Sequence, residues 1–182
     1  MTLLMLIIIL LVLLLGLYAY LDGFSEIKVS TQKSGGETIV YQEVTGDYKQ
    51  TKAITNKIYY YLLHKLKIEA NRGIGIFYDN PKEIAKDKLR SEIGCIIEAK
   101  DTNRLSINEC IYKIKVLPSE DYATAELPLK NGLSIFIGFI KVYPALDKYI
   151  SEQGKKKGSV TEIYDIPNRK IIYRQALLKC DQ

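Results

Sequence analysis

The sequence predicts an α+β domain, with helices packed on a largely antiparallel sheet, behind an N-terminal transmembrane helix. Three observations support this prediction. Residues 1–21 carry no charged side chain. After them, the order strand–helix–strand–strand occurs twice. The stretch Phe77-Tyr78-Asp79-Asn80-Pro81 also recurs as Ile163-Tyr164-Asp165-Ile166-Pro167, each time at the end of the strand that follows a helix, which favours an internal duplication.

Length and charge restrict the possible classes of function. The chain has 182 residues, with 26 Lys and Arg, 21 Asp and Glu and a single His, so its formal net charge is +5. One anchor plus about 160 residues fits a single domain. The length excludes a multi-domain enzyme and a multi-span transporter, and the composition excludes a coiled coil or a disordered chain.

The first 21 residues are predicted to form the anchor. At about 1.5 Å per residue, Leu3 to Leu21 spans about 28 Å, close to the hydrocarbon thickness of a bilayer. A cleaved signal peptide is the alternative. Against it, no Lys or Arg precedes the apolar run, the run exceeds the usual length, and Tyr18-Ala19-Tyr20 is a poor cleavage site. We therefore expect a single-pass membrane protein.

The flanking charges favour a cytoplasmic domain. Lys28 and Lys33 follow the apolar run and no basic residue precedes it, as the positive-inside rule requires for that orientation. The cysteines are consistent with this orientation. Cys95, Cys110 and Cys180 are odd in number and show no disulfide-framework spacing, as is usual for a domain in the reducing cytoplasm.

The first half of the domain is expected over residues 37–99, after a linker or short strand at 22–36. Residues 38–45 alternate and are β-branched, which predicts a strand. A helix is expected from an N-cap at Asp47 to about Ile68, because apolar residues repeat there at i+4. Strands are predicted at 74–79 and 93–99, with a short helical turn at 82–90 between them.

The second half is expected over residues 112–178, so that the whole domain fills 37–182. Residues 100–110 are polar and predict a loop. Strands are predicted at 112–117 and 122–127. A helix follows Asn131-Gly132; it is expected to bury Leu133, Phe136, Ile137 and Ile140, and to kink or restart at Pro144. An exposed loop at 154–158 precedes a hairpin of strands 160–166 and 170–177.

Glu162 is the most informative single residue. Strand alternation places it on the more apolar face of its strand, together with Val160, Tyr164 and Ile166. A carboxylate there is costly to desolvate unless it is paired, neutralised or bound to a cation. Two interpretations stay open: a carboxylate that receives a cationic ligand beside aromatic rings, and a structural Glu satisfied by Tyr hydroxyls or a Lys.

Three further residues are candidates for the same site. Tyr78 and Tyr164 occupy equivalent positions in the repeat and are proposed as aromatic walls, although packing is the usual role of a Tyr. Glu126 alternates with Tyr122 and Thr124 and is a candidate second acid.

Other chemistry receives little support from the sequence. His64 is the only histidine, which argues against His-rich metal sites and catalytic triads, and no phosphate-binding glycine motif occurs. We expect no metal and no cofactor. The lysines at 155–157 are most simply a solvated loop, and we expect no nucleic-acid partner.

Three stretches resemble a known family. They are Tyr78-Asp79-Asn80-Pro81 with Asp87-Lys88-x-Arg90 and Gly94; Val142-x-Pro144-Ala145-Leu146-Asp147-x-Tyr149-Ile150; and Glu162-Ile163-Tyr164. Together with the duplicated order, they resemble the GyrI-like (gyrase-inhibitor-like) small-molecule-binding domain, which also serves as the effector-binding module of bacterial transcription activators. Within that group the sequence is most similar to a membrane-anchored ER-phagy receptor carrying such a domain.

The resemblance implies a pocket between the two halves and an acidic residue in the last hairpin that receives cationic ligands, at the position of Glu162. Some relatives hydrolyse strained small molecules with a pocket Glu, and a haem-binding family shares the architecture. The receptor's autophagy-binding tail and the activators' DNA-binding half have no counterpart in this sequence, so we expect neither role to transfer.

Three functions follow from these patterns. The leading one is a membrane-anchored module that binds an amphipathic or cationic small molecule. The second is a membrane tether that recruits a protein partner through a sheet edge or the lysine loop. The third is a hydrolase in which Glu162 or Glu126 acts as a general acid or base.

Overall fold

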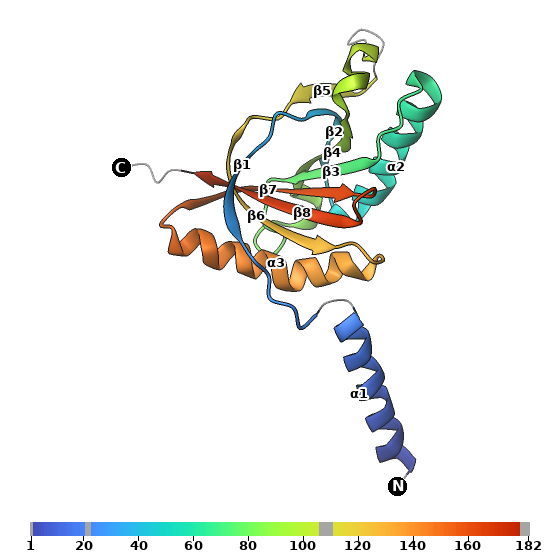
Figure 1. The fold of residues 1–182 in the computed structure, drawn as a ribbon, viewed down its shortest axis with the longest axis vertical. Coiled ribbons are helices and arrows are strands. Elements are labelled where there is room, and N and C mark those ends of the chain that lie inside the picture. The colour runs from blue at the N-terminus through green and yellow to red at the C-terminus, as the bar shows by residue number, and fades with distance from the viewer. Residues whose placement is uncertain (1, 21–22, 106–110, 179–182) are drawn as a thin grey trace.

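The computed structural model describes residues 2–20, 23–105 and 111–178. It confirms the predicted α+β class: an apolar N-terminal helix followed by helices packed on an eight-stranded antiparallel sheet (Figure 1). The helices are α1 (Thr2–Tyr20), α2 (Thr51–Tyr61) and α3 (Leu133–Glu152). The strands are β1 (Ser30–Ser34), β2 (Thr38–Thr45), β3 (Arg72–Phe77), β4 (Arg90–Ile97), β5 (Lys113–Val116), β6 (Glu120–Pro128), β7 (Lys156–Asp165) and β8 (Lys170–Leu178).

The strand order separates the two units that the sequence predicts. The order across the sheet is β1-β6-β8-β7-β3-β4-β2-β5. The units β2-α2-β3-β4 and β6-α3-β7-β8 therefore each form one side of the sheet, and they meet where β3 pairs with β7. In that pairing Gly73 lies opposite Tyr164 and Gly75 lies opposite Glu162. Glu162 is thus at the centre of the sheet, where the two units join.

Both α2 and α3 lie on the same face of the sheet. Ile58 and Leu62, from α2 and the π-helical turn after it, pack in a buried cluster with Val40 and Cys95. A Cβ added to Gly73 would lie 3.1 Å from Thr55 Cγ2 of α2, so this glycine lets α2 approach the central strands.

The α3 residues Val142, Leu146 and Ile150 pack in a second cluster, with Ala123, Ala125 and Tyr173 of β6 and β8.

The helix predicted after Gly46 forms in segments. Asp47 caps it as expected, because its Oδ1 accepts a 3.0 Å hydrogen bond from the Lys49 backbone N–H. A 3₁₀ turn (Tyr48–Gln50) leads into α2, and a π-helical turn (Leu62–Leu66) ends at Lys67, whose φ of 57° is left-handed. The predicted turn at 82–90 is reduced to a 3₁₀ turn (Lys86–Lys88), and another (Ala99–Arg104) lies in the predicted loop 100–110, part of which is outside the described residues.

The expectations for α3 and for the lysine loop require correction. Of the two outcomes expected at Pro144, a kink or a second segment, the second segment does not form, because α3 is a single helix that continues through Pro144. Of the four residues expected to be buried, only Ile137 is; Leu133, Phe136 and Ile140 are exposed, because the sheet lies under the other side of the helix. The exposed loop at 154–158 is shorter than expected, since β7 already begins at Lys156.

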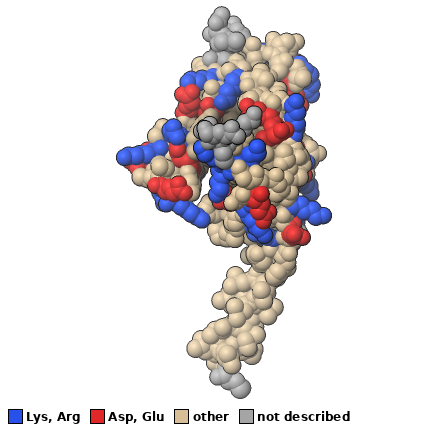
Figure 2. Space-filling view, turned by 90° about the vertical axis from the view of Figure 1, so that its left-hand side faces the viewer, with Lys and Arg blue, Asp and Glu red and all other residues tan. Residues whose placement is uncertain are grey.

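The N-terminal helix projects from the domain. By length and composition α1 is able to cross a membrane, and a signal sequence has the same properties. Figure 2 shows it as a projection without charged side chains, whereas Lys, Arg, Asp and Glu are interspersed over the visible face of the domain.

Candidate functional site

Glu162 lies under α3 and is held by two tyrosine hydroxyls. Strand alternation directs its side chain from β7 toward the helix-covered face. Its Oε1 accepts a 2.6 Å hydrogen bond from the hydroxyl of Tyr143 on α3. Its Oε2 accepts a hydrogen bond from the hydroxyl of Tyr164, two residues along the same strand. Only 7% of Glu162 is exposed.

The surroundings of this carboxyl group disfavour its charged form. Desolvation raises the pKa of Glu162, and the hydrogen bonds from Tyr143 and Tyr164 oppose this rise only in part. Within the described part of the chain, no Lys or Arg pairs with Glu162. Burial, together with the neighbouring carboxylate, also raises the pKa of Tyr143 and of Tyr164, so both remain hydrogen-bond donors. Glu162 is therefore a buried acid that has no cationic partner among the residues that the structure describes.

Tyr173 completes the aromatic surroundings. It lies opposite Glu162 on β8, is fully buried, and meets the Tyr143 ring edge-on at 6.1 Å between centroids. Its hydroxyl has no hydrogen-bond partner among the described residues. A Cβ at Gly138 of α3 would lie 1.9 Å from this hydroxyl oxygen, so the helix can pass over Tyr173 only with glycine at that position.

Glycine on the neighbouring strand also shapes the site. Gly75 lies opposite Glu162, and a Cβ added there would stand 2.7 Å from Cζ of Phe77. The absence of a side chain at Gly75 therefore leaves room for the Phe77 ring over the strand position opposite Glu162. Glu162 thus lies between Tyr173 and Gly75 of the two neighbouring strands and contacts the hydroxyls of Tyr143 and Tyr164.

The structure brings together only part of the set predicted from the sequence. Glu162 and Tyr164 are in contact. Tyr78 and Glu126 lie on the opposite face of the sheet, because each is displaced by one residue from the face that α2 and α3 cover. The pKa of Tyr78 is raised by burial and by Glu92 on that other face. Glu126 is exposed and pairs with Lys170 at 2.7 Å.

Sequence reasoning missed Tyr143 and Tyr173. Tyr143 lies in a helical segment that is apolar on all sides. The direction of its side chain depends on how α3 is rotated over the sheet, which the sequence does not show. Tyr173 follows from strand register, since a cross-strand partner of Glu162 on the last hairpin must share its face. The hairpin of the last two strands was predicted, so Tyr173 could have been identified by assuming the register in which these strands pair.

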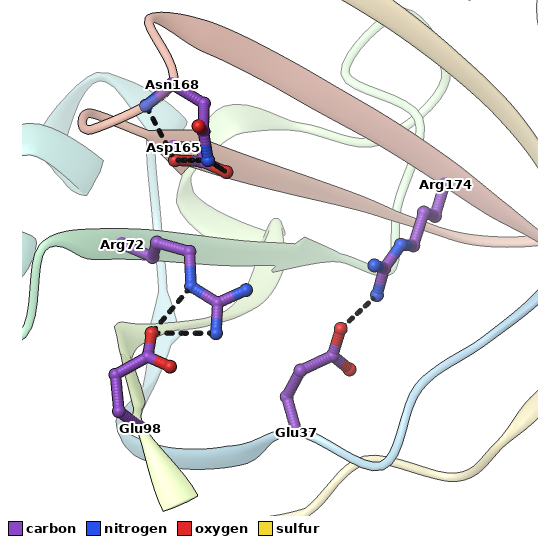
Figure 3. A network of polar contacts seen from close by, with 6 residues as sticks. All are labelled: Glu37, Arg72, Glu98, Asp165, Asn168 and Arg174. Atoms are coloured by element: carbon purple, nitrogen blue, oxygen red, sulfur yellow. Dashed lines mark hydrogen bonds and ion pairs between the residues drawn. The ribbon is translucent and has the colours of Figure 1, made fainter.

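The other face of the sheet carries a polar cavity. Figure 3 shows three polar pairs on this face: Arg72–Glu98, Asn168–Asp165 and Arg174–Glu37. A surface cavity of about 760 Å³ lies beside the first two pairs, and its lining includes Lys67, Glu69, Asn71, Lys100, Asp101 and Arg104. Arg104 pairs with Asp101 at 3.1 Å, as Arg72 does with Glu98 at 2.9 Å. These charges already compensate one another, which makes this cavity a weaker candidate than Glu162.

Solved structures share the fold of this domain. The C-terminal domain of EcmrR covers 85% of this chain and 99% of its own length, with a TM-score of 0.59 and 11% identity. SAV2435, solved bound to tetraphenylphosphonium, covers 84% of this chain and 94% of its own, with a TM-score of 0.53 and 13% identity. At these identities the likeness concerns the fold, and it agrees with the fold that the GyrI-like resemblance implies.

Curated sequences give a second comparison. Human testis-expressed protein 264 is 29% identical over 150 residues, which are 79% of this chain and 47% of that protein. Its mouse homologue is 29% identical over 99 residues, 51% of this chain and 32% of that protein. The chain thus spans less than half the length of these curated relatives. No family model matches the sequence.

Proposed function

We propose that this chain is a membrane-anchored module that binds an amphipathic, cationic small molecule, with Glu162 as the counter-ion. The observation that carries the proposal is a buried carboxyl group that has tyrosine hydroxyls as partners and, among the described residues, no basic one. The fold has already removed this group from water, so a bound cation would find a partner in a low-dielectric site, where ionic attraction is strong. The surrounding Tyr rings add cation–π attraction.

Entry of a ligand requires a rearrangement of Tyr143. Its hydroxyl occupies Oε1 of Glu162, and its ring lies 5.7 Å from the half-exposed Phe139 ring on the same helix. Phe139, Tyr143 and Glu162 are thus in contact one after another from the surface to the buried acid, and we propose this row of contacts as the path of entry. Rotation of Tyr143, or a small shift of α3, would release the carboxylate to a ligand.

Two further observations support the proposal. SAV2435, which shares the fold, was solved with tetraphenylphosphonium, a lipophilic cation of the kind that this site would accept. The uncharged α1, with Tyr18 and Tyr20 at its end, has the length and composition of a membrane span, and we propose that it anchors the domain.

The experiment measures binding of tetraphenylphosphonium to the detergent-solubilised chain by titration calorimetry. We expect wild type to bind and Glu162→Gln to lose at least tenfold in affinity, since the amide keeps the shape of the side chain but not its charge. Glu126→Gln is the matched control, because Glu126 lies on the opposite face. Triphenylphosphine oxide, a neutral analogue, should bind wild type and Glu162→Gln equally.

The direction of the pH dependence is fixed by the same chemistry. A cation competes with the proton on Glu162, so affinity should rise with pH through the raised pKa of that group. Equal affinity of wild type and Glu162→Gln for the cation would overturn the role of Glu162. Absence of binding to wild type would contradict the module itself and favour the recruiting tether.

A further inference from the structure

Helix α3 exposes an apolar side that no other described element covers. Five residues in its first two turns are at least 40% exposed: Leu133, Ile135, Phe136, Phe139 and Ile140. Phe136 is the most exposed of them, at 61%. Four of the five, at positions 133, 136, 139 and 140, follow one another at steps of three or four residues (133 to 136, then 136 to 139 and to 140), which puts them on one side of a helix. An exposed apolar patch of this kind marks an interaction surface.

The position of α1 identifies the partner of this patch. Lys130, just before α3, donates from Nζ to the backbone carbonyl of Tyr20 at 2.6 Å. Lys141, within α3, donates from Nζ to the carbonyl of Gly23 at 2.5 Å. Tyr18 also packs against the buried cluster under α3. The end of α1 is therefore one side-chain length from α3, and α3 must lie close to any membrane surface at which α1 ends.

The orientation of α3 agrees with this position. Figure 1 shows α3 lying crosswise between the sheet and α1, with the sheet on one side of it and α1 extending away on the other. The apolar patch is on the side away from the sheet, because Ser134, Ile137 and Gly138, which face the sheet in the same two turns, are buried. A helix with one apolar side, which lies along a membrane surface, typically buries that side about 5–10 Å into the headgroup and acyl boundary.

We propose that the exposed side of α3, formed by Leu133, Phe136, Phe139 and Ile140, lies in the interfacial layer of the bilayer that α1 crosses. This inference rests on the anchoring part of the proposed function and not on ligand binding. On this proposal, one side of α3 covers the Glu162 site and the other side contacts lipid. Phe139, which contacts Tyr143, then faces lipid, so an amphipathic cation dissolved in the bilayer would meet the path to Glu162 directly.

The test uses the full chain in phosphatidylcholine vesicles with brominated acyl chains, which quench tryptophan only on contact. The sequence has no Trp, so each introduced Trp reports alone. Phe136→Trp probes α3, and Tyr60→Trp, at a similarly exposed position on α2, is the matched control. Leu11→Trp, in the middle of α1, reports whether the anchor is inserted.

We expect Leu11→Trp and Phe136→Trp to be quenched by the brominated lipid, and Tyr60→Trp to keep its emission. Quenching at position 11 without quenching at position 136 would overturn the interfacial role of α3 and leave the anchor intact. If the emission of Phe136→Trp is blue-shifted but not quenched, protein covers the patch, for example a second copy of the chain, and the proposal is again wrong. Loss of quenching at both positions would reject the anchor and this inference together, while tetraphenylphosphonium binding in detergent would still test Glu162.

Discussion

The Tyr143 hydroxyl donates a 2.6 Å hydrogen bond to Glu162, which ties α3 to the central strand of the sheet. α3 is also held to the sheet by apolar packing against β6 and β8. At its other end, the Thr31 backbone N–H of β1 donates to the Tyr149 hydroxyl at 3.1 Å, and Asp147 pairs with Lys157 of β7 at 2.9 Å. The bond from Tyr143 thus joins α3, the helix that covers the candidate site, to the buried carboxyl group of Glu162. The contribution of this bond to the free energy of unfolding can be measured by substitution of either residue.

We expect Tyr143→Phe to destabilise the domain by about 1–3 kcal/mol, the usual cost of leaving a buried hydrogen-bonding group without its partner. The loss should shrink in the Glu162→Gln background, because the two side chains act as a pair. Urea unfolding of the detergent-solubilised chain measures both values. Tyr60→Phe, at an exposed position on α2, should stay within about 0.5 kcal/mol of wild type. Equal losses in the two backgrounds would show that the bond contributes nothing specific.

The pH dependence of stability should report the buried acid. Because the pKa of Glu162 is raised on folding, the folded state holds the proton more tightly than the unfolded state. Its contribution to stability is therefore greatest below the unfolded pKa of about 4.3 and is lost as pH rises through the folded pKa. Relative to Glu162→Gln, wild type should lose stability across this window. A constant difference between the two proteins would mean that Glu162 titrates normally.

Most of the fold could be predicted from local pattern. β2 begins at Thr38 and ends at Thr45 as expected, because alternation and the following glycine define both ends. The rotation of α3 could not be predicted, since apolar residues occur all round its first half. The expectation that Leu133, Phe136 and Ile140 are buried failed for that reason: hydropathy does not distinguish a side that packs on the sheet from one that faces away from it.

The candidate site was predictable only where it lies within one strand. Glu162 and Tyr164 share a face by alternation alone, so their contact followed from the sequence. Tyr78 and Glu126 were grouped with them by repeat and by residue type, but the faces of two different strands are related only through register. A slip of one residue reverses every side chain of a strand, and the structure places both residues on the other face.

Removing the hydroxyl of Tyr173 should not lower the stability of the domain. This group is buried and has no hydrogen-bond partner among the described residues, so it carries a desolvation cost without a bond in return. We expect Tyr173→Phe to be neutral or to stabilise the domain by up to about 1–3 kcal/mol in urea unfolding. A clear destabilisation would indicate that the hydroxyl is satisfied in solution, for instance by a buried water.

Gly138→Ala tests the close approach of α3 to the same hydroxyl. The added methyl group would stand 1.9 Å from the Tyr173 oxygen, inside the core, so the helix or the ring must move. We expect a loss of about 1–3 kcal/mol, as overpacked cores show. Tyr173→Phe in the same chain should restore part of the loss, because it removes the nearest atom. Gly132→Ala, where nothing lies within 4 Å of the added Cβ, is the control and should have little effect.

Asp79 should give stability the opposite pH dependence to Glu162. Its Oδ1 accepts from Arg90 Nη2 at 2.7 Å, and its Oδ2 accepts from the Arg90 backbone N–H at 2.7 Å and from Nε at 3.0 Å. The hydrogen bonds from the Arg90 side chain lower the pKa of Asp79 below its ordinary value. The contribution of a carboxylate with a lowered pKa is present above the unfolded pKa of about 3.9 and is lost as pH falls through the folded pKa.

Acidification should therefore cost wild type more stability than it costs Asp79→Asn, in which this group no longer titrates. Glu43→Gln is a suitable control, since Glu43 forms an ion pair with Lys113 in which both side chains are more than half exposed, and such pairs contribute little. Urea unfolding from neutral pH down to about pH 3 covers the relevant window. Parallel losses in wild type and Asp79→Asn would show that the ion pair with Arg90 does not persist in solution.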